Sequence, residues 1–376
     1  MNELMIVATC TFGLEKVLKR EVTDLGYKIE KVEDGKIYFK GSIRDIMNAN
    51  LHLRCAGRVL LYITSFFANS FDELFDNVNS YPWENIFDKN AGFNPTRISS
   101  IKSKLFSKRD IQKIVKKAIV ERMKSKYKLR SLSESGSYYE IFVNIKNDKV
   151  SLFFNTSGAG LHKRGYRENA LKAPLKETLA SGIIELSGYR GDRPFSDVMC
   201  GSGTIVIEAA MKAKNIAPGL KRNFAFEKWQ LFDKETFELL KEEARSNIRP
   251  AEIRLLGSDL DYKAIKLANE NARKAGVEDC VAFQKLDMRD FRSKKKRGTM
   301  IVNPPYAERI GQEKEVIQLY KDFFKVYENL DEWKLFVLCA HPMFQKYFGI
   351  KADKNRKLFN GNMLCYLYQY YPSKII

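Results

Sequence analysis

Helical and strand-like stretches alternate along the second half of the chain, from about residue 175 onward. Segments 175–188 and 262–276 have helical periodicity, whereas 299–303 is an apolar run of strand length. Because strands separated by helices are joined by right-handed crossovers, this alternation predicts a doubly wound parallel sheet. We therefore expect an α/β fold with a Rossmann-like C-terminal domain over residues 161–376.

Two smaller α+β units are expected to precede this domain. The first covers residues 1–60 and has a hairpin signal at residues 34–35, between two alternating strand patterns. The second covers residues 61–160, and a long amphipathic helix begins in it at Ser107. The glycine-rich, basic stretch 161–175 then forms the linker to the C-terminal domain.

The positive charge of the chain is concentrated in one segment. The formal net charge of the 376 residues is +19, and between Arg97 and Arg130 thirteen Lys and Arg residues stand against two acids, Asp110 and Glu121. Such a cluster favours a polyanionic partner, with nucleic acid as the first candidate. The alternative is a lysine-rich solvated surface, which would spread its charge more evenly.

Composition argues against several classes of protein. No apolar run approaches the roughly 18 residues of a membrane span, and no charged segment precedes the short apolar stretch near the N-terminus, as it would in a signal peptide. The six cysteines are scattered without a CxxC pair, and there are only three histidines. This usage indicates reduced thiols and disfavours a zinc or multi-histidine site. We expect a cytoplasmic protein without a membrane segment or a metal ion.

The first strand of the C-terminal domain ends in a glycine-containing loop. Ligands of a doubly wound sheet bind beyond the C-terminal ends of its strands, and here Asp197 is followed by Gly201 and Gly203, which allow close approach of a backbone to a ligand. A dinucleotide fold would have a third glycine at the position of Val206. The pattern disfavours NAD as the ligand, and a nucleoside ligand without a pyrophosphate is still compatible with it. The alternative is that the loop is a plain structural turn.

Acidic residues follow the next two strands. Asp259 would accept hydrogen bonds from both hydroxyls of a ribose, and Asp287 from the exocyclic amine of an adenine. Each has a simpler interpretation, because Asp259 could cap the following helix and Asp287 could be an ordinary loop acid.

The fourth strand ends in the unusual sequence NPPY. Asn303 and Pro304 each precede a proline and are therefore held in extended conformations, and neither Pro304 nor Pro305 has an N–H. The amide oxygen of Asn303 and the ring of Tyr306 would make a rigid socket for a planar group that carries an NH₂. The alternative is that these residues merely end the strand and begin a loop.

The four strand ends together resemble the class I S-adenosylmethionine-dependent methyltransferases of the amino-methylating NPPY type. The resemblance implies S-adenosylmethionine as the cofactor and two sets of site residues. The cofactor-binding set is Asp197, Cys200, Gly201, Ser202, Gly203, Asp259 and Asp287, and the catalytic set is Asn303, Pro304, Pro305 and Tyr306. Val198 and Val206 depart from the family pattern, in which prolines are usual, and this bears on cofactor affinity.

The N-terminal half is similar to the corresponding part of bacterial THUMP methyltransferases. "SIKSKLFSKRDIQKIVKKAIVER" resembles the core of a THUMP domain, and "LHKRGYR" and "NIAPGLKRNFAFEKW" resemble linker and insertion signatures of that family. The resemblance implies a ferredoxin-like domain over 1–60, a THUMP RNA-binding domain over 61–160 and a methyltransferase domain over 161–376. It also implies RNA contacts from Lys102, Lys104, Lys108, Arg109, Lys113, Lys116 and Lys117.

The activity implied by this resemblance is methylation of the N2 amine of a guanine in large-subunit (23S) ribosomal RNA. Asn303 and the carbonyl of Pro304 would hold the two amine hydrogens, and Tyr306 would stack on a base taken out of its helix. The rival readings are a tRNA guanine-N2 methyltransferase, a DNA adenine-N6 or glutamine-N5 enzyme, and a non-catalytic RNA-binding assembly factor.

Overall fold

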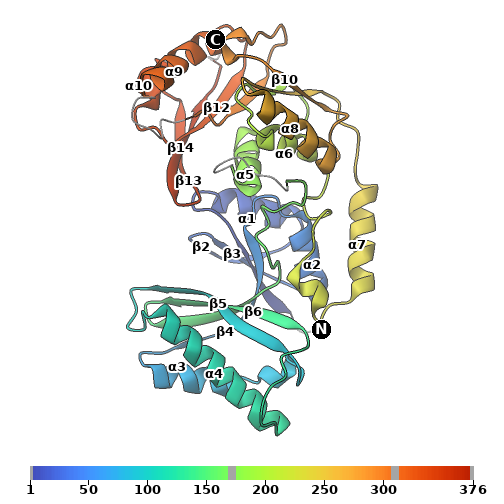
Figure 1. The fold of residues 1–376 in the computed structure, drawn as a ribbon, viewed down its shortest axis with the longest axis vertical. Coiled ribbons are helices and arrows are strands. Elements are labelled where there is room, and N and C mark those ends of the chain that lie inside the picture. The colour runs from blue at the N-terminus through green and yellow to red at the C-terminus, as the bar shows by residue number, and fades with distance from the viewer. Residues whose placement is uncertain (1–2, 168–174, 306–312, 373–376) are drawn as a thin grey trace.

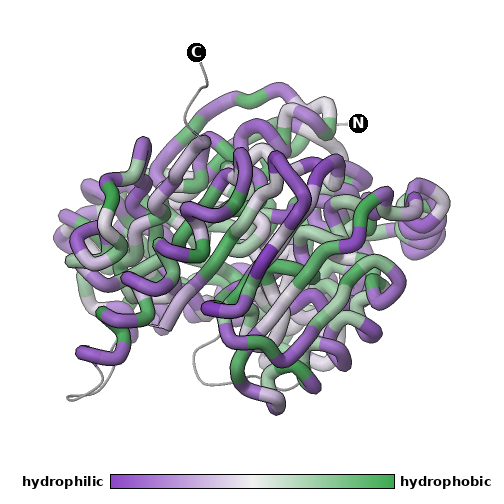
Figure 2. Tube along the Cα trace, turned by 90° about the horizontal axis from the view of Figure 1, so that it is seen from above, coloured by the Kyte–Doolittle hydropathy of each residue, from purple (hydrophilic) through white to green (hydrophobic). Residues whose placement is uncertain are grey.

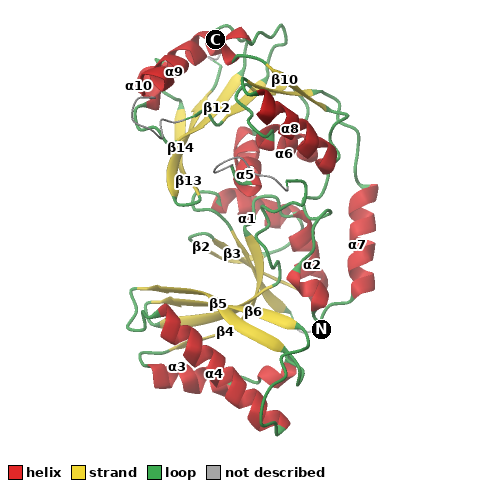
Figure 3. Cartoon of the chain, viewed as in Figure 1, coloured by secondary structure: helices red, strands yellow, loops and turns green. Residues whose placement is uncertain are grey.

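The computed structural model describes residues 3–167, 175–305 and 313–372. The molecule is elongated, with one sheet in the upper part of the view and the other extending from the middle to the lower part (Figure 1). Helices and strands alternate in the upper part of the view, as the sequence pattern predicted (Figure 3). None of the described helices is both long and apolar enough to cross a bilayer.

One seven-stranded sheet forms the N-terminal half, in the order β2-β3-β1-β4-β7-β6-β5. Its strands are β1 (Leu4–Thr9), β2 (Ile29–Glu33), β3 (Lys36–Gly41), β4 (Arg58–Phe67), β5 (Gly92–Ile101), β6 (Tyr138–Lys146) and β7 (Lys149–Asn155). Strand β4 pairs with β1 on one side and β7 on the other, so the sheet is continuous across the expected boundary at residues 60 and 61. The two expected N-terminal units therefore share one sheet.

Helices cover only one face of this sheet. They are α1 (Glu15–Asp24), α2 (Ile43–His52), α3 (Phe71–Ser80) and α4 (Lys108–Tyr127), with a short 3₁₀ turn η1 (Trp83–Asn85). Along β6 every second residue is buried, beginning with Tyr139 and Ile141, while Tyr138, Glu140 and Phe142 lie on the other face and are exposed or half-buried. The core thus lies between the sheet and its helices, and the opposite face stays partly open.

The second seven-stranded sheet has the order β10-β9-β8-β11-β12-β14-β13. Its strands are β8 (Phe195–Asp197), β9 (Leu255–Asp259), β10 (Val281–Lys285), β11 (Thr299–Val302), β12 (Lys334–Cys339), β13 (Lys354–Asn360) and β14 (Met363–Tyr370). Strands β8 to β12 are parallel, but β14 runs antiparallel to both β12 and β13. The expectation of a Rossmann-like domain is confirmed. The expectation of a parallel sheet holds for β8 to β12 but is wrong for the C-terminal hairpin of β13 and β14.

Helices pack on both faces of the second sheet. They are α5 (Glu177–Ser187), α6 (Thr204–Ala213), α8 (Tyr262–Ala275), α9 (Glu313–Glu328) and α10 (Phe344–Phe348), with the 3₁₀ turn η3 (Met288–Asp290). The left-handed residues Gly188 and Gly276 end α5 and α8. Strand β13 and helix α10 were not foreseen from the sequence.

The segment between α6 and β9 belongs to the core of the other half of the molecule. It contains η2 (Ala225–Lys228) and α7 (Lys234–Ser246), and α7 runs beside α2 of the N-terminal half in Figure 1. Viewed from above, α7 is a largely hydrophilic helix at the right edge (Figure 2). Trp229 of this segment stacks on Tyr139 of β6, with 4.6 Å between ring centres. This segment therefore anchors the C-terminal domain to the N-terminal sheet.

A buried ion pair stabilises the junction between the halves. Arg164, in the linker, lies 3.3 Å from Glu208 of α6, and its guanidinium also donates to the carbonyl of Arg54 in the N-terminal half. Arg356 of β13 donates to the carbonyl of Gly13 at 2.9 Å. These contacts connect the two halves of the molecule at two separate places.

Candidate functional site

Four strand ends meet at one edge of the C-terminal sheet. Strands β10, β9, β8 and β11 are neighbours in that order, so the residues that follow them lie in a row. Asp197 ends β8, Asp259 ends β9, and Asn303 directly follows β11. Asp287 lies two residues beyond β10. The sheet therefore brings together the site residues that the sequence placed far apart along the chain.

Hydrogen bonds join the first two of these ends. The amide of Cys200 donates to the carbonyl of Ser258 at 2.9 Å, and the amide of Gly201 donates to Oδ2 of Asp259 at 2.8 Å. The other carboxylate oxygen of Asp259 accepts from the amide of Asp261 at 2.9 Å. Asp259 is thus held in a fixed orientation against the glycine loop.

The two glycines of the loop have different surroundings. Gly203, at φ 81°, starts α6, and a Cβ placed there would lie 2.8 Å from the ring of Phe283 and 3.0 Å from Ala268. A Cβ on Gly201, at φ 52°, would meet no atom within 4 Å. Gly203 is therefore required by packing, whereas Gly201 borders open space from which a ligand could approach the backbone.

Asp197 is a buried carboxyl group beside this open space. It is 1% exposed, and its Oδ1 accepts from the amide of Met199 at 3.1 Å. Burial raises the pKa of Asp197 well above its usual range, and the charge of Asp259 raises it further. No described cation pairs with Asp197, so a positively charged ligand group would be stabilised here.

The remaining residues of the expected cofactor set lie near the same edge. The carbonyl of Ser202 accepts from the side-chain amide of Asn271 in α8 at 3.1 Å, and the side chain of Ser202 is buried. The carboxylate of Asp287 accepts from the amide and the guanidinium of Arg289, which is also paired with Asp322. Both carboxylate oxygens of Asp287 are therefore engaged by Arg289.

The backbone after β11 is held by α9. Asn303 is half-buried, Pro304 is buried and Pro305 is exposed. The hydroxyl of Tyr320, in α9, donates to the carbonyl of Pro305 at 2.9 Å. Tyr306, the fourth residue of the expected catalytic set, lies outside the described residues. The three described residues are brought to the edge of the sheet beside β8 by strand pairing.

The predicted RNA-binding residues lie on and before α4. Lys102, Lys104, Lys108, Arg109, Lys113 and Lys117 are exposed, and Lys116 is half-buried. The ammonium of Lys116 lies 2.6 Å from Glu134 and above the ring of Phe93, so its charge is engaged within the protein. Lys117 lies over the ring of Phe75. The side chains of this set therefore differ in their contacts: Lys116 is paired with an acid, whereas Lys117 lies over an aromatic ring.

This fold and this row of strand ends define an S-adenosylmethionine-dependent methyltransferase of the Rossmann-like class. The open space at Gly201, the oriented carboxylate of Asp259 and the buried carboxyl of Asp197 fit that cofactor. The chain belongs to the family described as RMKL-like methyltransferase domain, which matches residues 164–369. An RlmL ferredoxin-like domain matches residues 5–60 and a THUMP domain matches residues 68–155. The family predicted from the sequence is confirmed.

Two named relatives match along almost the whole chain. "Putative RNA methyltransferase YpsC" of Bacillus subtilis (strain 168) is 40% identical over 375 residues, which are 99% of this chain and 97% of that protein. "Ribosomal RNA large subunit methyltransferase K/L" of Psychromonas ingrahamii is 34% identical over 95% of this chain but only 49% of that protein. The chain thus spans about half the length of the K/L relatives.

Solved structures share the complete fold. The structure of "a possible methylase from Clostridium difficile 630" is 44% identical and covers 100% of both chains with a TM-score of 0.97. "SMU.472, a putative methyltransferase complexed with SAH" is 38% identical, with 100% of both chains covered and a TM-score of 0.94. SAH is the product form of S-adenosylmethionine.

Two residues at this edge were missed by the sequence reasoning. Tyr320 falls within a helix pattern, and nothing in the sequence indicates that its hydroxyl reaches the proline loop. Leu260 directly follows Asp259 and is 63% exposed, which makes an apolar side chain available to a ligand beside the carboxylate. A sequence signal for Leu260 was available, because it is an apolar residue between two acids in the motif GSDLD.

Proposed function

We propose that this chain is an RNA methyltransferase that transfers a methyl group to the N2 amine of a guanine in large-subunit (23S) ribosomal RNA. The observation that carries the proposal is the oxygen-lined proline loop of Asn303, Pro304 and Pro305, held by Tyr320 next to the glycine loop of a methyltransferase. The basic N-terminal half, the THUMP match and the names of the relatives support RNA as the substrate.

Each site residue has a role in this proposal. S-adenosylmethionine supplies a methyl group already activated on a sulfonium. Gly201 leaves room for it, Asp259 accepts hydrogen bonds from its ribose, and Asp287 accepts from its adenine amine. Asp197 offers a negative charge to its positively charged end. Cys200, Ser202 and Gly203 shape the loop around it.

The proline loop would act on the substrate amine. The side-chain oxygen of Asn303 and the carbonyl of Pro304 accept the two amine hydrogens, which directs the nitrogen lone pair outward and stabilises the positive charge that develops on it. Tyr306 stacks on the extruded base. Neither step needs a metal ion, and no described group of His, Cys, Asp or Glu has metal-binding geometry.

The N-terminal half would hold the RNA in the cytoplasm, where ribosomes assemble. In this proposal residues 1–60 are the ferredoxin-like domain, 61–160 the THUMP domain and 161–376 the methyltransferase domain with its linker at 161–175. The exposed cations Lys102, Lys104, Lys108, Arg109, Lys113 and Lys117, with Lys116, contribute phosphate contacts that weaken as salt rises.

Comparison of methylated nucleotides in cells with and without this protein tests the proposal. We expect one N2-methylguanine to be lost from 23S ribosomal RNA in the deletion strain and restored by the parent gene but not by an Asn303→Ala gene. Mass spectrometry of purified ribosomal and transfer RNA gives the readout. Loss confined to transfer RNA would replace the proposed substrate with tRNA, and no loss in either RNA would favour the non-catalytic assembly factor.

A further inference from the structure

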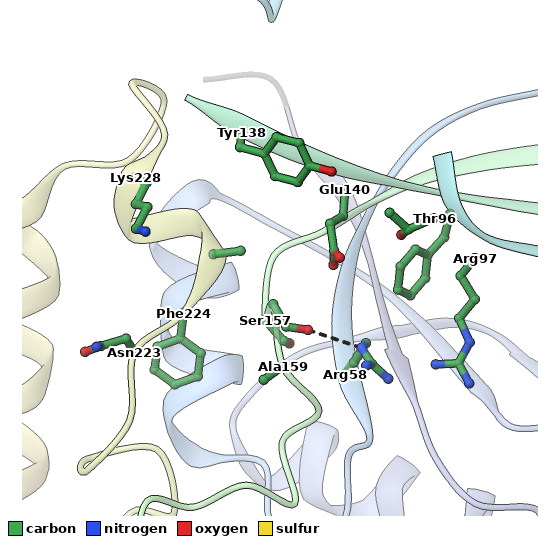
Figure 4. A pocket seen from close by; sticks show the side chains of 13 residues that line it. Arg58, Thr96, Arg97, Tyr138, Glu140, Ser157, Ala159, Asn223, Phe224 and Lys228 are labelled. Carbon is green, nitrogen blue, oxygen red and sulfur yellow. Dashed lines mark hydrogen bonds between the residues drawn. The ribbon is translucent and has the colours of Figure 1, made fainter. Parts of the chain in front are cut away.

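A cavity of about 730 Å³ lies on the open face of the N-terminal sheet, remote from the methyltransferase edge. Its floor is formed by the outward side chains of β6, and its walls by residues 157–159 and by the loop 223–228 (Figure 4). Trp229 donates its indole N–H to the carbonyl of Tyr138, and Ser137 donates to the carbonyl of Lys228, so the loop is fixed to the end of β6. The cavity is therefore a built feature of the fold.

Three cations line this cavity without an acidic partner among the described residues. They are Arg58, Arg97 and Lys228. The guanidinium carbons of Arg58 and Arg97 lie 5.7 and 5.9 Å from the centre of the same ring, that of Phe142, and Figure 4 shows both side chains on one side of the cavity. Burial and the charge of Arg97 lower the pKa of Arg58, and the carboxylate of Glu140, which also lines the cavity, only partly offsets this effect. An anion placed between the two arginines would relieve this repulsion.

The basic helix α4 offers less free charge from Lys116 onward than its sequence implied. Lys116 is paired with Glu134, and both Arg122 and Lys126 are paired with Glu84. The cavity, by contrast, combines two guanidinium groups that form no ion pair with a described acid, although Nε of Arg58 donates to the carbonyl of Gly158, with partial enclosure, which strengthens the attraction of an anion. Charge in the cavity is therefore more available to a phosphate than charge on that part of α4.

The opposite side of the cavity suits a base. The ring of Tyr138 is 48% exposed at the rim. Glu140 accepts from the side-chain amide of Asn155 through Oε2, and its other oxygen makes no hydrogen bond to any described residue. An aromatic face for stacking and a free carboxylate oxygen for an N–H group are the features by which proteins hold an unstacked base.

We propose that this cavity binds one unpaired nucleotide of the RNA substrate, with a phosphate at Arg58 and Arg97, the base on Tyr138 and a base N–H donated to Glu140. The volume lies in the range of about 300–1,000 Å³ that is usual for small-ligand sites. This inference rests on the proposed function, because it assumes an RNA substrate. It adds a place where single-stranded RNA is held far from the methylated base.

Binding of labelled RNA to the full-length protein tests the inference. The probe is a fluorescein-labelled ten-nucleotide single-stranded RNA, measured by fluorescence anisotropy across a salt series, with an unlabelled RNA duplex and poly-glutamate as competitors. The variants are Arg58→Gln/Arg97→Gln and Tyr138→Ala. The control is Lys19→Gln/Lys234→Gln, which removes the same charge from exposed lysines on α1 and α7.

We expect the arginine double variant to bind the single strand about tenfold more weakly than the control, and its salt slope to be shallower by about 0.7, since the contact with one phosphate is lost. Tyr138→Ala should weaken binding by about tenfold without changing the slope. Equal affinity of the double variant and the control would overturn the inference. Equal competition by the duplex, or by poly-glutamate, would also overturn it.

The outcome is separable from that of the proposed function. Methyl transfer from tritiated S-adenosylmethionine to purified 23S ribosomal RNA by the parent protein tests the activity alone. If the parent methylates this RNA and the arginine double variant keeps the parent KM for it, the cavity proposal is wrong while the activity stands. A raised KM with unchanged kcat in the double variant supports the cavity as a binding site.

Discussion

The hydroxyl of Tyr320 donates a hydrogen bond to the main-chain carbonyl of Pro305, with 2.9 Å between the two oxygens. Tyr320 is fully buried on α9, and the same hydroxyl lies 3.4 Å from the sulfur of Cys339 in β12. The carbonyl two residues beyond Asn303 is therefore fixed from behind by a side chain of the core. Helix α9 holds the proline loop in place although it contributes no residue of the expected catalytic set.

Tyr320→Phe should impair catalysis and spare cofactor binding. Without the hydroxyl the carbonyl of Pro305 loses its anchor, and a displacement of the loop misplaces the oxygen atoms that are proposed to hold the substrate amine. We expect kcat for methyl transfer to fall by about tenfold, with the Kd for S-adenosylmethionine unchanged in calorimetry.

Tyr327→Phe is the matched control for this variant. Tyr327 also lies on α9, and its hydroxyl donates to the carbonyl of Trp333 at 3.0 Å, at the start of β12. Equal loss of kcat in both variants would show that general loosening of α9, and not the anchor on Pro305, causes the defect.

Asn303→Ala should abolish most methyl transfer while the protein still binds its cofactor. The side-chain oxygen of Asn303 is proposed to stabilise charge that develops on the amine, and removal of one such group typically costs about 10²–10³ in kcat. Asn303 is half-buried at the surface of the site, so the substitution leaves the fold intact. Single-turnover transfer to 23S ribosomal RNA gives the measurement, with Asn329→Ala at the exposed end of α9 as control. Near-parental turnover in Asn303→Ala would contradict the proposed mechanism.

The sequence predicted the parts of this molecule whose signals are local. Helix α4 begins after Ser107, as expected, because the side chain of Ser107 caps it. The placement of Trp229 against Tyr139 was not predictable, since it depends on a segment of one half packing into the core of the other. Strand β13 was missed because its polar sequence carries no strand periodicity, and its partner β14 alone defines it.

Gly201→Ala and Gly203→Ala should have different consequences. A Cβ at Gly203 would lie 2.8 Å from Phe283, so this variant should lose thermal stability. A Cβ at Gly201 would enter open space, so Gly201→Ala should fold with only the strain of its positive φ and bind S-adenosylmethionine at least tenfold more weakly. Differential scanning calorimetry and a cofactor titration on both variants provide the check. Parental cofactor affinity in Gly201→Ala would mean that the cofactor does not approach this loop.

Glu208→Ala should strongly destabilise the protein. Glu208 accepts hydrogen bonds from Arg164, Tyr166 and Ser181, and its side chain is fully buried. Removal of one partner leaves a buried guanidinium without a counter-charge, which typically costs about 3–5 kcal/mol.

The control for this variant is Glu238→Ala, which removes an exposed partner of Lys241 and should destabilise the protein far less, because exposed ion pairs contribute little to stability. Urea unfolding of both variants gives the comparison. A cost for Glu208→Ala no larger than that of the control would show that the buried pair contributes little at the junction.

Asp197→Asn should stabilise the cofactor-free protein at neutral pH. Burial raises the pKa of Asp197, so the folded protein holds this proton more tightly than the unfolded chain does. The associated stability is complete below the unfolded-state pKa of about 3.9 and is lost as the pH rises through the folded-state pKa. Asparagine cannot ionise and keeps the contact with the amide of Met199.

The thermal midpoint of Asp197→Asn should therefore exceed that of the parent at pH 8 and approach it toward pH 5, in the absence of S-adenosylmethionine. Asp192→Asn is the control with the opposite sign. The exposed carboxylate of Asp192 is paired with Arg193, which lowers the pKa of Asp192. Loss of this carboxylate should therefore lower the thermal midpoint slightly at pH 8. A midpoint for Asp197→Asn below that of the parent at pH 8 would mean that the carboxylate has a stabilising partner, and that the site is not prepared to receive a cation.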